Sequence, residues 1–290
     1  MNIKSKIPSL LILTAAFLWG LTGIFVRTLN ASGLNNMELL FFRSSVTALT
    51  LVIYLFLTDK GKLKIKLKDT WYFIGTGILS FTLFGFCYFY TIAHASMSLA
   101  AMLLYTAPFF VMIMAAIFFR EKITATKILS LLAAAIGCVM ICSTDKNTNI
   151  SPLIIFTGLS SGFCYALYSI FGRVALKKYS SVTVTAYTFL FASVASMFLV
   201  DFPAVYNVLT GNPKTVLLTV TFAYISAFFP YILYTQGLKN TESGKAAVMA
   251  TFEAVVASVA GIVVFGESIT VIAASGIFLV LFSVFLLNRK

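Results

Sequence analysis

Ten runs of about 20 apolar residues follow one another along this chain, and no other feature constrains its fold as strongly. They cover residues 8–29, 36–58, 71–93, 97–119, 124–143, 151–171, 182–203, 215–237, 244–265 and 270–288. About 20 apolar residues are needed for a helix to cross the roughly 30 Å hydrocarbon core of a bilayer. The connections between the runs hold turn-forming residues and leave no room for a soluble domain. We therefore predict an all-α, polytopic membrane protein with ten transmembrane helices.

The composition agrees with this prediction. Of the 290 residues, 60% are hydrophobic and 10% are charged, and the mean hydropathy is +0.99, which no soluble domain could cover with a polar surface. Lys and Arg outnumber Asp and Glu by 21 to 9. Five of the lysines lie in the short loop 60–68 between two apolar runs, a pattern typical of a cytoplasmic loop beside anionic lipid. We expect the lipid bilayer, and no nucleic acid, to be their partner.

The basic residues also predict the orientation of the chain. Most of them lie in connections on the side of the N-terminus, whereas Arg27, Lys146 and Lys214 lie on the opposite side. Since basic loops stay in the cytoplasm, both termini are expected on the cytoplasmic side. The protein itself is expected in the plasma or inner membrane. Lys4 and Lys6 precede the first run as in a signal peptide, but the run is too long and has no clear cleavage site, so we take it as the first span.

The chain contains an internal repeat. The segment FLWGLTGIFVR, residues 17–27, aligns with FCYALYSIFGR, residues 163–173, at a shift of 146 residues, and the same shift pairs Glu121 with Glu267. Each repeat holds five spans, an odd number, so the second repeat must enter the membrane with the opposite polarity. The sequence therefore predicts a 5+5 inverted repeat, residues 1–145 and 146–290, in one integral membrane domain. Secondary carriers are built this way and bind substrate near the midplane between the halves.

Glu253 is the one acidic residue in the middle of an apolar run, within residues 246–265. A charge at this depth costs roughly 2.5 to 3.5 kcal/mol on insertion scales, so it is usually paired, hydrated or placed on a substrate or ion path. As a site residue, Glu253 has two roles open to it: binding a substrate ammonium, or cycling a proton as the coupling ion. The alternative is a buried ion pair with Arg43, which lies nearer the outer end of its span.

Three segments resemble the ten-helix EamA branch of the drug/metabolite transporter superfamily over essentially the whole chain. They are Leu18-Trp19-Gly20, YTAPFFVMIMAAIFFRE from Tyr105 to Glu121, and TFEAVVASVAGIVVFGES from Thr251 to Ser268. The family often has Glu-Pro where this chain has Glu253 followed by Ala254, so the resemblance does not fix a helix break there. It implies a carrier with a central cavity between the halves that opens alternately to each side. Relatives carry amino acids, quaternary amines, drugs or sugar phosphates, so the resemblance leaves the substrate open.

Aromatic residues mark the candidate substrate site. Trp19 and Tyr165 are equivalent in the two repeats and lie near the middle of their spans, where an N–H or O–H favours a cavity or a cross-helix hydrogen bond over lipid. The resemblance places Tyr105, Tyr231 and Tyr234 beside the cavity. For each tyrosine, the alternative role is an interhelical hydrogen bond.

Pro108 and Gly20 are two further candidates, for gating. Pro108 removes a backbone hydrogen bond, so its helix can bend there. Gly20 with Gly23, and Gly75 with Gly77, are expected to allow close helix contact rather than to cradle a phosphate.

Cofactors and metals are not expected. All four cysteines lie inside apolar runs and carry no secreted disulfide framework. Cys138 and Cys142 share a helix face, but no His or carboxylate lies near them in the sequence, so they are interpreted as small buried hydrophobic residues.

The function that these features favour is secondary transport of a small organic metabolite, with export of amino acids or related metabolites as the first choice and transport of an organic cation as the second. An intramembrane enzyme would need paired carboxylates, a His cluster or a metal constellation, and a channel a repeated filter or charged ring. Arg43 aside, no Lys or Arg lies at the midplane of a span, which argues against sugar phosphates and nucleotide sugars. The direction of transport, the coupling ion and the choice between monomer and homodimer remain open.

Overall fold

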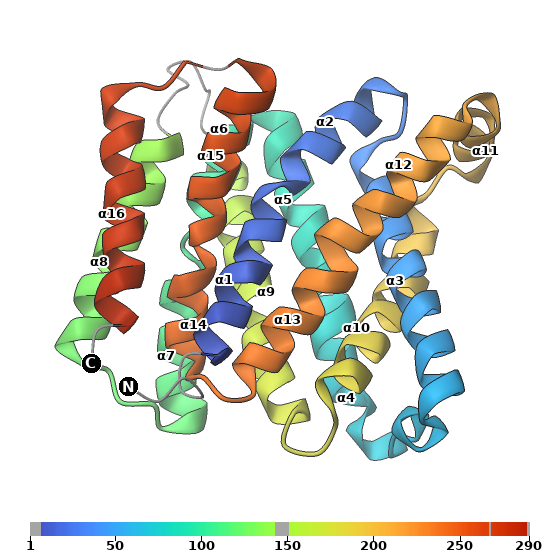
Figure 1. Cartoon of the computed structure of the whole chain (residues 1–290), viewed down its shortest axis with the longest axis horizontal. Helices are drawn as coiled ribbons and strands as arrows, with labels where there is room; N and C mark the ends of the chain where they lie inside the picture. The colour runs from blue at the N-terminus through green and yellow to red at the C-terminus, as the bar shows by residue number, and fades with distance from the viewer. Residues whose placement is uncertain (1–6, 143–150, 267, 289–290) are drawn as a thin grey trace.

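The computed structural model describes residues 7–142, 151–266 and 268–288. It confirms the ten predicted spans, with bounds within about four residues of those predicted, for example Leu67–His94 against 71–93. The connector 144–150 and the proposed boundary between repeats at 145–146 lie outside the described residues. Helix α1 (Ile7–Gly20) begins at the lower end of the bundle in Figure 1, and helix α16 (Val271–Asn288) ends at the same end.

Residues 7–142 form the first five spans. Their helices are α1, α2 (Thr22–Ala31), α3 (Asn36–Thr58), α4 (Thr70–Phe73), α5 (Leu83–His94), α6 (Met97–Leu104), α7 (Ala107–Phe119) and α8 (Ala125–Cys142). Helix α3 begins with a capping box: the Asn35 side chain accepts from the N–H of Glu38, and the Glu38 side chain accepts from the N–H of Asn35. A polar start of this kind fixes where an otherwise apolar helix begins.

The second five spans follow. Their helices are α9 (Pro152–Ala175), α10 (Ser181–Ser196), α11 (Phe202–Gly211), α12 (Pro213–Ala223), α13 (Phe229–Leu238), α14 (Ser243–Ala250), α15 (Phe252–Phe265) and α16. Helix α11 is too short to span the membrane and lies at the upper edge of the bundle (Figure 1). The sequence analysis did not predict it, because its first two residues prolong the preceding apolar run. The Asp201 side chain, which accepts from the N–H of Ala204, starts it.

Helix breaks recur at equivalent positions of the two repeats. Span 4 is interrupted between α6 and α7 at Tyr105 and Thr106, and span 9 between α14 and α15 at Thr251, which is 146 residues beyond Tyr105. At each break a threonine hydroxyl donates to the carbonyl three residues earlier, from Thr106 to Leu103 at 2.6 Å and from Thr251 to Val248 at 2.7 Å. Such back-bonding bends helices. The break in span 9 therefore needs no proline after Glu253.

The same shift relates two further irregular segments. Residues Ile74–Thr82 and Tyr224–Phe228 form π-helix, and 78–82 is equivalent to 224–228. Helices α7 and α15 end on the left-handed residues Arg120 (φ 55°) and Gly266 (φ 67°), again 146 residues apart. π-Helical turns are frequent at functional sites, and these two segments lead into the helices that carry the central aromatic residues.

Helices of the two halves pack against each other through the depth of the bundle. Helix α1 contacts α13, α14 and α15, α3 contacts α10, and α5 contacts α9. Glycine allows the closest approaches: a Cβ at Gly77 would lie 2.4 Å from the Thr188 carbonyl oxygen, and one at Gly75 would lie 2.5 Å from the Phe171 ring. The predicted role of these two glycines in close packing is confirmed.

Gly77→Ala is expected to destabilise the protein by about 1 to 3 kcal/mol, because the new methyl group overlaps backbone on α10. Gly23→Ala is the matched control, since a Cβ there meets nothing within 4 Å and alanine favours helix. Thermal unfolding in detergent should show a lower midpoint for Gly77→Ala only. Equal midpoints would contradict the packing described here.

Candidate functional site

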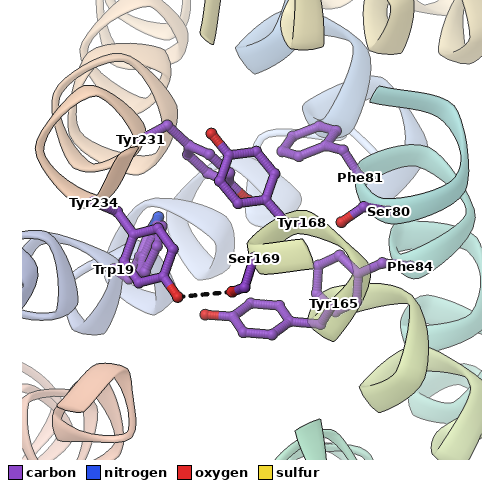
Figure 2. A pocket seen from close by; sticks show the side chains of 9 residues that line it. All are labelled: Trp19, Ser80, Phe81, Phe84, Tyr165, Tyr168, Ser169, Tyr231 and Tyr234. Carbon is purple, nitrogen blue, oxygen red and sulfur yellow. Dashed lines mark hydrogen bonds between the residues drawn. The ribbon is translucent and has the colours of Figure 1, made fainter. Parts of the chain in front are cut away.

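A small cavity lies at the centre of the bundle (Figure 2). The centre of a water molecule can occupy a volume of about 10 Å³ in it, so the cavity has room for about one water. Its lining comes from α1, the π-helical segment 74–82, α5, α9 and α13, and comprises Trp19, Ser80, Phe81, Phe84, Tyr165, Tyr168, Ser169, Tyr231 and Tyr234. A cavity of this size cannot hold a metabolite, so the conformation described is closed at its centre.

Trp19 lies in the middle of the aromatic cluster. Its ring centroid is 5.2 Å from that of Tyr231, 5.3 Å from that of Tyr234 and 6.4 Å from that of Tyr165. These distances are typical of interacting aromatic pairs. Four of the residues that the sequence analysis selected, from three different spans, therefore meet at one place.

The tyrosine hydroxyls divide into two groups. The Tyr234 hydroxyl is 2.8 Å from the Ser169 Oγ, and the Tyr168 hydroxyl is 2.6 Å from the Thr235 Oγ1, so both serve interhelical hydrogen bonds. Within the described part of the chain, the hydroxyls of Tyr165 and Tyr231 and the N–H of Trp19 make no hydrogen bond. The structural alternative thus fits Tyr234, whereas Trp19, Tyr165 and Tyr231 keep polar groups available for a ligand.

Glu253 lies in the first turn of α15, beside α1. A Cβ at Gly20 would be 2.8 Å from the Glu253 carbonyl oxygen and 2.5 Å from the Val256 Cβ, so only glycine lets α1 approach this turn. The positive end of the α15 dipole offsets part of the cost of the carboxylate. The Glu253 side chain is partly exposed and lies within electrostatic range of the Tyr88, Tyr105 and Tyr165 hydroxyls.

The alternative role of Glu253, an ion pair with Arg43, is absent from the structure. Across residues 7–142, 151–266 and 268–288, Glu253 makes no hydrogen bond and no ion pair. The Arg43 guanidinium carbon instead lies 4.5 Å from the ring centroid of Phe81, a residue that lines the cavity. Arg43 is therefore nearer the central cavity than its place in the sequence indicated.

Four candidates do not line the cavity: Glu253 and Gly20, described above, and Tyr105 and Pro108. Tyr105 packs with Cys138, Ala254 and Val255, on the Glu253 side of the bundle. Pro108 is buried in the first turn of α7, beyond the break in span 4. The lining residues that the sequence analysis missed are Ser80, Phe81, Phe84, Tyr168 and Ser169. They are common residue types within apolar runs, and no motif distinguishes them.

Ion pairs join the two halves at the lower end. Arg173 pairs with Glu121, which also accepts from the N–H groups of Ser243 (2.7 Å) and Gly244 (3.3 Å) at the start of α14. Glu121 therefore bridges to the second half, although its sequence neighbours Arg120 and Lys122 are basic as well. Its equivalent, Glu267, lies outside the described residues.

Two further pairs link the halves at this end. The Lys178 Nζ is 2.6 Å from the Asp69 Oδ1, and the Lys127 Nζ is 2.7 Å from the Glu242 Oε2. The hydrogen bond to Asp69 raises the pKa of Lys178 above its ordinary value. That ammonium therefore stays charged at physiological pH, and the links hold the lower end of the bundle closed.

Comparison with known proteins gives consistent results. The chain matches the EamA-like transporter family twice, over residues 6–143 and 152–289. It is 30% identical to an uncharacterized transporter of Archaeoglobus fulgidus over 198 residues, which are 68% of this chain and 70% of that protein. It is 28% identical to the pseudopaline exporter CntI of Pseudomonas aeruginosa over 198 residues, 68% of this chain and 66% of the exporter.

The fold has a close counterpart among solved structures. One crystal structure superimposes with a TM-score of 0.79 and covers 96% of this chain and 95% of its own, at 15% sequence identity. At this identity the likeness shows the fold alone. Because the family match covers both halves of the sequence, this multi-pass membrane protein belongs to the EamA-like transporter family.

Proposed function

We propose that this protein exports amino acids or related small organic metabolites by alternating access, with the central aromatic cavity as the substrate site. The observation that carries the proposal is the convergence of uncommitted polar groups at that cavity. Trp19, Tyr165 and Tyr231 line it and make no side-chain hydrogen bond with the described residues, and the Glu253 charge acts on the two tyrosine hydroxyls. Polar groups that line a cavity and have no protein partner are suited to bind a polar ligand there.

Alternating access is supported by a contact that occurs twice, at opposite ends of the bundle. At the lower end the Arg173 guanidinium lies 5.0 Å from the Phe119 ring centroid, and at the upper end the Arg27 guanidinium lies 4.2 Å from that of Phe265. Both residues of the second contact are related to those of the first by the 146-residue shift. We infer two equivalent gates, one for each side, in an inverted pair of repeats, residues 1–145 and 146–290.

The basic loop residues favour a cytoplasmic lower end in the plasma or inner membrane. In this orientation the described conformation has its cytoplasmic gate closed by the Arg173–Glu121, Lys178–Asp69 and Lys127–Glu242 pairs. A proton is the coupling ion that we propose, carried by Glu253 when substrate is absent. Export, rather than uptake, is favoured by the similarity to a relative whose name states export.

An organic cation is the second candidate substrate. Glu253 is an anion beside Trp19, and an ammonium over an indole face gains about 0.5 to 2 kcal/mol. Arg43, stacked on Phe81 at the same cavity, disfavours a ligand that carries only positive charge.

Counterflow in proteoliposomes tests the proposal. Vesicles loaded with unlabelled amino acids should take up labelled amino acids faster than empty vesicles, and uptake should saturate with concentration, because a carrier exchanges substrate through one site. Conductance that does not saturate would contradict a carrier, and counterflow of choline but not of amino acids would favour the second candidate.

A further inference from the structure

Arg43 is a cation inside span 2, Asn36–Thr58. Within the described residues its guanidinium makes no hydrogen bond and no ion pair, and its Nε is buried without a partner. Its one described contact is the face of Phe81 at 4.5 Å. A cation at this depth is costly and normally finds an anion. The chain does not supply that anion where the structure describes it.

The position of Arg43 points to the cavity as the place where an anion would reach it. Phe81 lines the cavity, its ring centroid is 5.7 Å from that of Tyr231, and the Arg43 charge acts on the Tyr231 hydroxyl. Arg43 therefore does not line the cavity itself but contacts Phe81, which does and which Figure 2 shows near Tyr231. A guanidinium that stacks on an aromatic ring keeps the N–H groups in its own plane free, and these match the two oxygens of a carboxylate.

Glu253 does not line the cavity either, but its charge acts on three tyrosines that do, Tyr165, Tyr231 and Tyr234. It adjoins the Trp19-Gly20 turn of α1 and acts on the hydroxyls of Tyr165 and Tyr231. Tyr231 is thus within electrostatic range of both charges, although the two do not pair with each other. One cation and one anion without a partner among the described residues therefore lie near a closed cavity that is lined by aromatic side chains and two serines.

We propose that the substrate is a zwitterion whose carboxylate is bound by Arg43 and whose ammonium is bound by Glu253, between the rings of Trp19, Phe81 and Tyr231. This inference rests on the proposed function and narrows its substrate class. A ligand of net charge zero neutralises both charges at once, whereas a simple cation leaves Arg43 unpaired and a simple anion leaves Glu253 unpaired. Closure of the cavity around a zwitterion then carries no uncompensated charge into the membrane interior.

Three mixtures that share side chains but differ in charge test the assignment. They are the twenty proteinogenic amino acids, their methyl esters, which lack the carboxylate charge, and their N-acetyl derivatives, which lack the ammonium. Each mixture competes with labelled amino acids for counterflow in proteoliposomes. For the native protein, the amino acids should inhibit counterflow of the labelled amino acids at concentrations at least tenfold lower than the methyl esters or the N-acetyl derivatives.

Variants at the two charged residues should change this preference in opposite directions. In Arg43→Gln the advantage of the amino acids over the methyl esters should fall at least tenfold, while the N-acetyl derivatives stay excluded. In Glu253→Gln the advantage of the amino acids over the N-acetyl derivatives should fall instead, while the methyl esters stay excluded. Arg43→Lys keeps the charge and should retain most of the preference. The test compares the inhibitory concentrations of two mixtures for the same variant. A lower yield of folded protein affects both alike and leaves their ratio unchanged.

Three outcomes would overturn the inference. Choline or the methyl esters could exchange better than the amino acids, with no change in Arg43→Gln, which would leave a carrier of cations. Arg43→Gln and Glu253→Gln could lower exchange of all three mixtures equally, which would make both residues structural. Absence of saturable exchange with any mixture or with choline would instead remove the proposed function itself.

Discussion

Replacement of Arg173 by alanine is expected to lower the free energy of unfolding by about 3 kcal/mol, the lower end of the range for breaking a buried ion pair. The Glu121 side chain is only 7% exposed, and without Arg173 its charge loses its counter-ion at the boundary between the halves. The Ser243 and Gly244 N–H groups still bind the carboxylate, which keeps the loss moderate. Chemical unfolding in mixed micelles measures the effect.

A double variant and a neighbouring lysine serve as controls. Glu121→Gln together with Arg173→Ala removes both charges and should restore about half of the stability, because no buried charge is then left uncompensated. Lys177→Ala removes a charge whose Nζ lies 5.7 Å from the same Phe119 ring, and it should have little effect. If the double variant were as unstable as Arg173→Ala, the ion pair would not be what closes the lower end.

Trp19→Ala is expected to weaken substrate binding by about thirtyfold, the equivalent of about 2 kcal/mol, the upper end for a desolvated cation–π contact. The variant removes the ring that contacts Tyr165, Tyr231 and Tyr234 and leaves the cavity wall open beside Glu253. Trp19→Phe keeps an apolar ring and should lose about tenfold. Half-saturation concentrations in counterflow measure both effects.

Trp71 is the matched control for Trp19. It is the other of the two tryptophans in the chain, and its ring packs on Tyr72 and Phe171 away from the cavity. Trp71→Ala should leave the half-saturation concentration unchanged. Equal weakening by Trp19→Ala and Trp71→Ala would mean that loss of packing, rather than loss of a binding ring, explains both.

The spans could be predicted from sequence because hydropathy and length are local properties. The repeat placed Trp19 and Tyr165 at equivalent depths, and the structure brings them together with Tyr231 and Tyr234. Features that depend on where side chains extend could not be predicted. Arg43 begins in the outer third of its span, and the structure alone reveals that its long side chain reaches Phe81.

Hydrogen bonds across the bundle explain the remaining differences. The break at Thr251 comes from a hydroxyl that bonds back to Val248, and a rule based on proline misses it. The partners of Glu121 could not be predicted, because nothing local in the sequence reveals that Arg173 and the start of α14 lie beside it. Tyr105 occupies a span next to the cavity but faces Cys138 and Val255 on the far side of the break.

The most direct measurement of the central claim is the fluorescence of Trp19 in a Trp71→Phe protein, where Trp19 is the sole tryptophan. Titration with the amino acids that show counterflow should change the intensity or wavelength of its emission and should saturate at the concentration that half-saturates transport, because the ligand occupies the cavity that Trp19 lines. Saturable counterflow with no change in Trp19 emission would place the substrate elsewhere and contradict the account.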